Sequence, residues 1–111
     1  MARMVVIYQR PENPQAFDQH YFDVHIPLAK KLPKLKKYEV SRGDVVEVRR
    51  GEMVTKMDPP GPYLIGTLLF DDMPAIQRAF ASSEGRACAL DVRTLAPRGD
   101  YQMFLFDDRE V

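Results

Sequence analysis

The sequence predicts an α+β fold, in which helices pack on one face of an antiparallel sheet. Three observations support this class. Short apolar runs rich in β-branched and aromatic residues have the composition of strands. The segments between them carry apolar residues at helical spacing. Clusters of proline, glycine and aspartate separate the runs, as is typical of turns. We therefore expect the order β, α, β, β, α, β.

The first strand and the first helix are predicted from the N-terminal third of the chain. Residues 4–9 form an apolar run with two hydrophobic faces, which is typical of a strand covered on both sides. The proline-containing segment 10–14 ends it with a turn. An amphipathic helix is then expected from about Gln15 to Leu32, where Pro33 closes it.

A proline inside this helix predicts a break. Pro27 has no backbone N–H, and its ring disfavours the α region for Ile26, the residue before it. We therefore expect the helix to kink or break near His25 and then to resume. With helical periodicity, the buried stripe is predicted to contain Phe17, Tyr21, Val24, Leu28 and Leu32, with His20 and His25 at its opposite edges.

The middle of the chain is predicted to contain strand structure followed by a rigid loop. Residues 38–49 carry an alternation of side chains that suits a strand. Gly43 marks either a bend in one strand or a turn between two shorter ones. Residues 50–62 include the sequence Asp-Pro-Pro-Gly-Pro, which cannot belong to a sheet interior, so a loop is expected there.

Two further strands are predicted in the second half of the chain. Residues 63–70 are the clearest strand and are apolar on both faces. Gly66 in the middle either permits a bulky group to approach the backbone or relieves crowding against a helix. Residues 101–106 form the final strand, after a turn at residues 98–100.

Two helical runs are expected between these strands, at residues 73–81 and from 84 to about 95. Ser82 or Ser83 can cap the second run. Asp91 is interpreted as a surface carboxylate, with a role as a partner of the functional site as the alternative. The inner side of the second run is predicted to carry Ala87, Leu90, Thr94 and Leu95.

This order of elements matches the βαββαβ arrangement of ferredoxin-like folds, with helices on one face of a four-stranded antiparallel sheet. The first, third and fourth strands are apolar on both faces, and 111 residues leave too little chain to cover the second face. A second copy of the chain would cover it. We therefore expect a homodimer whose two sheets face each other across a two-fold axis.

Composition narrows the possible functions. The sixteen basic and sixteen acidic residues cancel, so no global field attracts nucleic acid or an anionic membrane. Cys88 is the single cysteine, which excludes an internal disulfide and predicts a buried, inert thiol. No phosphate-binding, dinucleotide-binding or metal-ligand motif is present, so we expect neither a cofactor nor a metal. Without a signal peptide or a membrane span, residues 1–111 are predicted to form one cytoplasmic domain.

His25 is the leading candidate for chemistry. Histidine titrates near neutral pH, and this ring lies at the predicted helix break beside aromatic residues. Tyr21, one helical turn earlier, would orient the imidazole or donate a hydrogen bond to a substrate. Phe17, Tyr38 and Tyr63 are the candidates for binding that substrate. The alternative is structural: a histidine bonded to a carbonyl or water, and aromatic rings packed in the core.

Two short motifs occur together in the first third of the chain: Phe17-x3-Tyr21-x3-His25-x-Pro27-Leu28, and then Leu32-Pro33-x-Leu35-x2-Tyr38. Together they resemble the N-terminal pattern of EthD-domain proteins, which belong to the dimeric α/β-barrel superfamily. The strand pattern and chain length agree over most of the chain, although the specific part is confined to residues 17–43. The resemblance implies a ferredoxin-like domain that dimerises into a shared barrel. It also implies that His25 is the polar residue of the cleft between helices and sheet.

The resemblance leaves two functions open. The first is a cofactor-independent isomerase, decarboxylase or monooxygenase-like enzyme. It would act on a small apolar oxygenated compound, such as a lactone, a phenol or a polyketide, with His25 as general acid or base. The second is a non-catalytic accessory or ligand-binding dimer that supports a degradative oxygenase system, such as one for ethers. In that case His25 only anchors the broken helix.

Overall fold

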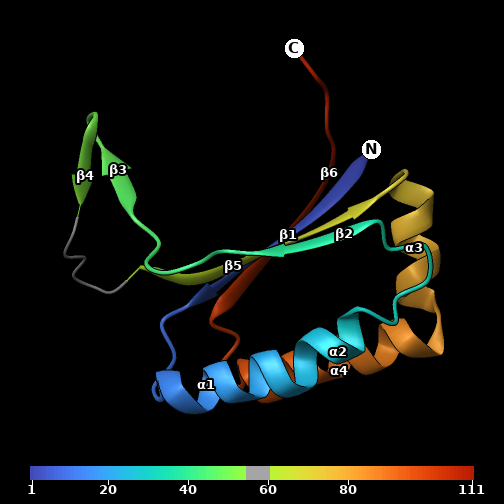
Figure 1. Cartoon of the computed structure of the whole chain (residues 1–111), viewed down its shortest axis with the longest axis horizontal. Coiled ribbons are helices and arrows are strands. Elements are labelled where there is room, and N and C mark those ends of the chain that lie inside the picture. Colours follow the sequence, from blue (N-terminus) through green and yellow to red (C-terminus); the bar gives the residue numbers. More distant parts are fainter. Residues whose placement is uncertain (55–60) are drawn as a thin grey trace.

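The computed structural model describes residues 1–54 and 61–111 and has the predicted ferredoxin-like α+β architecture (Figure 1). Its sheet has four antiparallel strands in the order β2-β5-β1-β6. The elements are β1 (Ala2–Gln9), α1 (Pro14–His20), η1 (Tyr21–His25), α2 (Ile26–Ala29), β2 (Lys37–Val40), β3 (Glu47–Arg49), β4 (Glu52–Val54), β5 (Pro62–Phe70), α3 (Met73–Ala81), α4 (Ser83–Leu95) and β6 (Tyr101–Asp107).

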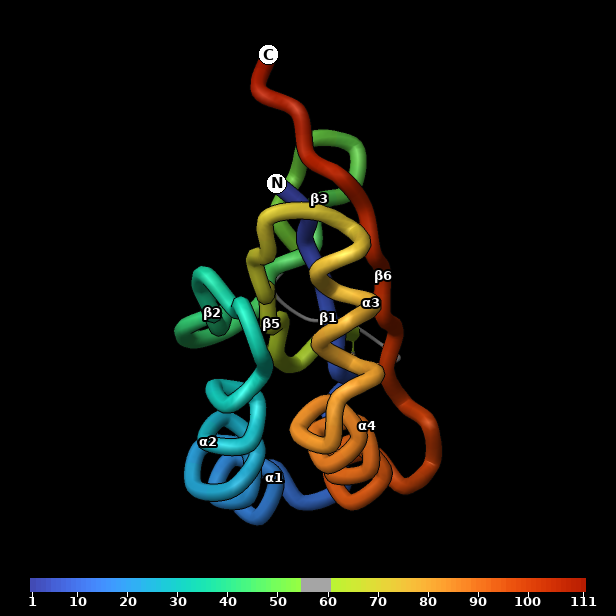
Figure 2. Tube along the Cα trace, turned by 90° about the vertical axis from the view of Figure 1, so that its right-hand side faces the viewer, coloured from blue at the N-terminus to red at the C-terminus, as the bar shows by residue number. Residues whose placement is uncertain are grey.

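The helices form a layer against one face of the sheet. Figure 2 shows α4 beside the segment formed by α1 and α2, with α3 running from this layer along the strands. The alternate residues of β1 that face the helices, from Ala2 to Tyr8, are buried. No helix within the described residues combines the length and the hydropathy needed to cross a bilayer.

The first helix does not break at Pro27 but widens before it. Tyr21–His25 form a turn of π-helix, in which the N–H of Ile26 donates to the carbonyl of Tyr21. Ile26 keeps ordinary α-helical angles, with φ of −59° and ψ of −47°, so its predicted displacement was wrong. Pro27 falls in the first turn of α2, directly after the π turn.

The π turn also changes which residues of this helix face the core. Val24, predicted to be buried, is 41% exposed, whereas His25 is only 4% exposed. A π turn contains an extra residue, so the buried face advances from the predicted position 24 to position 25. The buried side chains are Phe17, Tyr21, His25, Ala29 and Leu32.

The middle of the chain contains a hairpin that the sequence analysis did not predict. Gly43 has a φ of +75° and separates β2 from β3, so the alternative of two shorter strands is confirmed. Arg50 and Gly51 both have positive φ and form the turn between β3 and β4, within the predicted loop. Residues 55–60 of the expected loop lie outside the described residues.

Helix α4 begins as predicted but turns a different face inward. The side chain of Ser82 accepts a hydrogen bond from the N–H of Gly85 and caps the helix. A Cβ at Gly85 would lie 2.2 Å from the carbonyl oxygen of Ala79, so α3 and α4 meet at contact distance there. The inner face of α4 contains Gly85, Cys88, Val92 and Leu95, which repeat at helical spacing, while the predicted inner residue Leu90 is 59% exposed.

The second face of the sheet carries apolar side chains, and no helix of the described residues lies over it. Val5 and Ile7 of β1 and Ile65 of β5 are only half-buried. On the neighbouring edge strand β6, Phe104 and Phe106 are 49% and 42% exposed. The pairing of β1 with β5 and β6 aligns these side chains on the side of the sheet away from the helices.

Candidate functional site

His25 is held in the core by a carboxylate from the other side of the helical layer. Its Nδ1 lies 2.9 Å from Oδ2 of Asp91, which α4 contributes. The other oxygen of Asp91 lies 2.8 Å from Nε2 of His20, at the end of α1. The side chain of Asp91 is 11% exposed, so its interpretation as a surface carboxylate was wrong and the alternative, a partner of the site, agrees with its position. One carboxylate therefore joins the two histidines of the chain.

Burial keeps the His25 ring neutral. Removal from water lowers the pKa of His25 below its usual range, and the hydrogen bond and charge of Asp91 oppose this effect only in part. No fully buried side-chain nitrogen or oxygen among the described residues lacks a hydrogen-bond partner. Since the bond of the ring to Asp91 uses Nδ1, we infer that Nε2 is the atom through which His25 meets the adjoining cavity.

Two tyrosine hydroxyl groups meet beside this histidine. The Tyr21 ring lies 5.4 Å from that of His25, and its hydroxyl forms a short hydrogen bond with the hydroxyl of Tyr38 on β2. Burial raises the pKa of Tyr38 to about 12 and raises that of Tyr21 further, so both remain neutral hydroxyls. One of the two hydroxyl protons makes the bond between the rings, which leaves the other free for a ligand.

Gly66 makes room for this pair of hydroxyls. A Cβ at Gly66 would lie 3.0 Å from the hydroxyl oxygen of Tyr21 and 3.6 Å from the ring of Tyr38. The prediction that a bulky group approaches the backbone here is confirmed. Because glycine has no side chain, this position in the middle of β5 allows the two hydroxyls to meet next to the sheet.

His25, Tyr21 and Tyr38 line a common cavity of about 100 Å³ between the helices and the sheet. Polar atoms form only a small part of its wall. Typical small-molecule sites measure about 300–1,000 Å³, so this cavity has room only for a very small molecule or for one end of a larger one. Its remaining lining residues are Met4, Val6, Tyr8, Ala29, Leu68, Phe80, Cys88, Ala89, Val92 and Met103.

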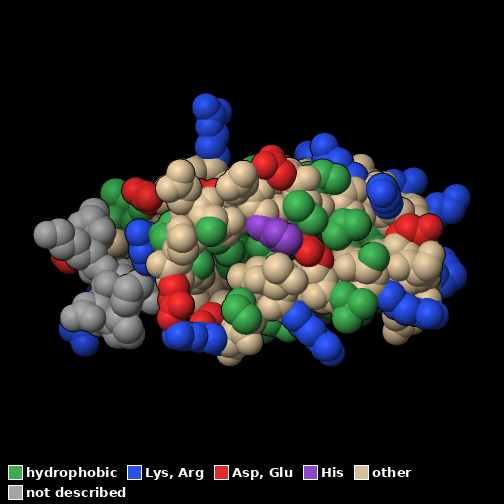
Figure 3. Space-filling view, turned by 90° about the horizontal axis from the view of Figure 1, so that it is seen from below, with side chains coloured by type: hydrophobic (Ala, Val, Ile, Leu, Met, Phe, Trp, Pro, Cys, Tyr) green, Lys and Arg blue, Asp and Glu red, His purple; other side chains and the backbone are tan. Residues whose placement is uncertain are grey.

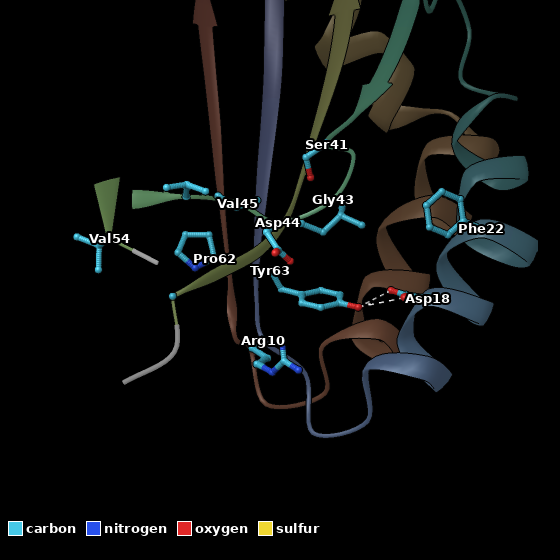
Figure 4. Close-up of a pocket in the computed structure, with 13 residues that line it drawn as sticks. Arg10, Asp18, Phe22, Ser41, Gly43, Asp44, Val45, Val54, Pro62 and Tyr63 are labelled. Carbon is cyan, nitrogen blue, oxygen red and sulfur yellow. Dashed lines mark hydrogen bonds between the residues drawn. The ribbon is translucent and has the colours of Figure 1, made fainter. Parts of the chain in front are cut away.

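The other two predicted binding residues lie away from this cavity. Phe17 stacks on Tyr21 with ring centroids 5.8 Å apart and separates it from Tyr63. The hydroxyl of Tyr63 donates to both oxygens of Asp18 on α1, at 2.9 and 3.0 Å (Figure 4). The guanidinium of Arg10 lies 5.6 Å from the centre of the same tyrosine ring. Tyr63 thus belongs to a second polar cluster on the hairpin side of the molecule.

This second cluster borders a hollow of about 620 Å³, larger than the cavity at His25, between Tyr63 and the β3–β4 hairpin (Figure 4). Volume alone would favour it as the site. Its wall is nevertheless open and mixes polar and apolar groups in about equal parts, so water competes for every hydrogen bond there. The cavity at His25 combines desolvation with a titratable ring, and we therefore regard it as the candidate site.

A third hollow, of about 350 Å³, lies at the N-terminal end of α1 and is bordered by His20. Figure 3 shows histidine atoms at the surface of the helical layer, next to acidic side chains. The side chain of His20 is 29% exposed, whereas that of His25 is 6% exposed. The Asp91 bridge therefore connects the buried ring to one that water reaches.

From the sequence, a role for Asp91 as a partner of the site was only the alternative interpretation. A regular helix would place His20 and His25 on different faces, so nothing in the spacing pointed to a shared carboxylate. Cys88 also lines the cavity, and burial raises the pKa of its thiol to about 11, which makes it the predicted unreactive group. Within the described residues, no group of three or more His, Cys, Asp or Glu side chains is arranged to hold a metal ion.

The fold and the site define a small ferredoxin-like protein with a buried histidine and tyrosine cavity between helices and sheet. The EthD domain model matches residues 9–98, and this chain belongs to the EthD family. The predicted resemblance is thereby confirmed over most of the chain.

Relatives support this assignment. The chain is 33% identical, over 111 residues, to an uncharacterized 11.0 kDa protein in the thcB-thcC intergenic region of Rhodococcus erythropolis, covering 100% of this chain and 97% of the relative. A crystal structure of an EthD-family protein from Bacillus halodurans has a TM-score of 0.80 at 29% identity, covering 98% and 99% of the two chains. SnoaB, a cofactor-independent oxygenase from Streptomyces nogalater, shares the fold with a TM-score of 0.63 at 17% identity, over 99% and 94%.

Proposed function

We propose that this protein binds a small apolar oxygenated compound, such as a phenol, a lactone or the end of a polyketide, in the cavity at His25. We further propose that it converts this compound by proton transfer, without a cofactor. The observation that carries the proposal is a buried, neutral imidazole that faces an apolar cavity together with two tyrosine residues whose hydroxyls are paired.

The proposed chemistry assigns a role to each polar residue. Nε2 of His25 accepts a proton from the bound compound, and the carboxylate of Asp91 stabilises the imidazolium that forms. The free hydroxyl proton of the Tyr21 and Tyr38 pair donates to the oxygen on which negative charge develops. The apolar wall excludes water, which strengthens these interactions relative to solvent. Phe17 supports the ring of Tyr21 from behind and has no proposed contact with the ligand.

Ligand entry is proposed to occur at the edge strand. Met103 of β6, which lines the cavity, is 42% exposed, and Ala89 of α4 is also exposed. The cavity therefore reaches the surface between β6 and α4. Methionine is unbranched and changes rotamer easily, so Met103 is suited to admit a ligand larger than the present volume.

The names of two relatives are consistent with this class of compound. The Bacillus halodurans protein carries the name of ethyl tert-butyl ether, a small apolar oxygenated molecule. The Streptomyces nogalater protein is described as an oxygenase that needs no cofactor. At 17% identity, that likeness supports the fold, so the reaction is proposed here on the residues of the cavity.

A panel of phenols, lactones and polyketide-like compounds tests the proposal. General acid or base catalysis contributes on the order of 10²- to 10⁴-fold, so His25→Ala should lower turnover by at least about 100-fold. Tyr63→Phe is the matched control outside the cavity and should retain activity. Unchanged turnover in a folded His25→Ala variant would reject the catalytic assignment. Ligands that bind without product would favour the accessory role.

The uncovered sheet face supports a proposed homodimer in either role. Phe104 and Phe106 extend the apolar surface of Val5 and Ile7 across to the sheet edge. Contiguous apolar surface of this kind marks an interaction site, and a second copy offers a matching sheet. Light scattering should report a dimer for the native chain and a monomer for Phe104→Lys. Dimers of unchanged stability in that variant would contradict this interface.

A further inference from the structure

The bridge from His20 through Asp91 to His25 is more specific than a buried histidine requires. A single bond would satisfy Nδ1 of His25, yet the carboxylate also receives the second histidine, at 2.8 Å. The two rings lie five residues apart, His20 at the end of α1 and His25 at the end of η1, which continues the same helix. In a regular α-helix, residues at that spacing point about 140° apart and cannot share one partner.

The π turn removes this obstacle. It occupies residues 21–25, between the two histidines, and turns His25 onto the face that meets α4. Single π turns within α-helices are frequent at functional sites. Its position here brings both imidazoles to one carboxylate, which the same number of residues in an α-helix would not do.

The hydrogen bonds to Asp91 then determine which nitrogen of each histidine ring carries a proton. An ionised carboxylate only accepts, so the ring nitrogens that face Asp91 must both donate. For His25 this places the proton on Nδ1 and the lone pair on Nε2. For His20 it places a proton on Nε2. Around the ring, the Cys88 thiol and the Tyr38 hydroxyl stay neutral at physiological pH, since burial raises their pKa values to about 11 and about 12.

We propose that Asp91, tied in place by His20, is a positioning residue that fixes His25 as a hydrogen-bond acceptor toward the cavity, and that the ligand therefore presents a donor O–H group, as a phenol or an enol does. This inference rests on the proposed function and narrows its substrate class. A lactone or an ether has no such donor and would leave the acceptor nitrogen unpaired.

His20 acts on Asp91 by occupying the second carboxylate oxygen. Without it, the carboxylate is free to turn toward the hollow that His20 borders, and the tautomer of His25 loses its constraint. Glutamine carries an amide N–H near the position of Nε2, whereas leucine fills the space without a donor. His20→Gln should therefore preserve the bridge, and His20→Leu should weaken it.

Nitrogen NMR of the ¹⁵N-histidine-labelled full chain at neutral pH tests the positioning role. In the native protein, His25 should carry its proton on Nδ1, and Nε2 should show the shift of an acceptor. Asp91→Leu should give a mixture of both tautomers. His20→Leu should move toward that mixture, and His20→Gln should restore the native pattern. A native ring protonated on Nε2, or an unchanged tautomer in a folded Asp91→Leu protein, would overturn the assignment.

Phenol and toluene test the ligand class, because they have nearly the same shape and only phenol has an O–H. Native protein should bind phenol at least about 10-fold more tightly than toluene, and Asp91→Leu should lose this preference. If Asp91 had only a structural role, Asp91→Leu would weaken the binding of phenol and toluene by the same factor. The ratio of the two affinities would then stay unchanged. Equal binding to native protein would overturn the donor requirement. If neither compound shifts the His25 signals while Nδ1 carries the proton, the positioning role stands and the proposed function fails.

Discussion

Two clusters in this protein contain the same kinds of group in opposite surroundings. The inner cluster joins Tyr21, Tyr38 and His25 to Asp91 beneath the helices, around a cavity of about 100 Å³. In the outer cluster, Tyr63 donates to Asp18 at the edge of a hollow of about 620 Å³. The larger hollow is open and mixes polar and apolar groups, while the smaller one is almost entirely apolar.

From this difference we expect proton chemistry where the groups are desolvated and not where the hollow is larger. In the inner cluster, burial shifts the pKa of His25 downward and that of Tyr38 to about 12. Burial and the hydrogen bond to Asp18 also raise the pKa of Tyr63, but that tyrosine stands in an open hollow where water competes for its partner. The following predictions separate the two clusters, from the largest effect to the smallest.

Truncation of a ring should cost far more stability in the inner cluster. Tyr21 is 1% exposed and packs against Tyr8 and Phe17, so Tyr21→Ala leaves a cavity in the core. We expect a loss of about 3–5 kcal/mol in the free energy of unfolding. Tyr63→Ala removes a half-buried ring and should cost on the order of 1 kcal/mol. Denaturant unfolding measures both, and equal losses would contradict the distinction.

The absence of a side chain at Gly66 should matter for the inner cluster, because the Tyr21 hydroxyl occupies the space next to this glycine. Gly66→Ala places a Cβ 3.0 Å from the Tyr21 hydroxyl oxygen, so the ring must shift. We expect a loss of about 1–3 kcal/mol in the free energy of unfolding, as for other overpacked cores. Tyr21→Phe removes the hydroxyl, so Gly66→Ala should cost less in that background. The same cost in both backgrounds would show that the hydroxyl is not what limits the space.

The pH dependence of stability should carry a contribution from His25. Since burial lowers its pKa in the folded state, the unfolded chain binds more protons once the pH falls below about 6.5. Stability should therefore decrease as the pH falls from about 6.5 through the folded-state pKa. His25→Asn retains an N–H for Asp91 but cannot titrate, so its slope in this window should be smaller. Tyr63→Phe is the control and should keep the native slope; equal slopes for native protein and His25→Asn would contradict burial as the cause.

The overall fold was predictable because its signals are local. Strands such as residues 63–70 are marked by composition, and the start of α4 is marked by the cap at Ser82. The β3–β4 hairpin was missed because its turn, at Arg50 and Gly51, lies within a segment where prolines suggested only a loop. Tight hairpin turns with positive φ at both central positions favour glycine and asparagine, and arginine is unusual there. The Arg50-Gly51 pair was therefore only a weak indication of a hairpin.

The site was predictable only in part because its geometry depends on the π turn. Helical periodicity placed His25 at the edge of the buried stripe, and the extra residue of the π turn moved it to the centre. The prediction for Asp91 failed because the wrong face of α4 was assigned to the core: Leu90 is exposed, whereas Cys88 and Val92 are buried. Both errors concern which face of a helix points inward, which depends on tertiary contacts that a single sequence does not display.

The location of bound phenol tests the central claim most directly. A crystal structure of the native chain soaked with phenol should show the ring against Met103 and Ala89, with its oxygen within hydrogen-bond distance of Nε2 of His25. Phenol found instead beside Tyr63, with the inner cavity closed around the imidazole, would show that the larger hollow is the binding site and would contradict the account.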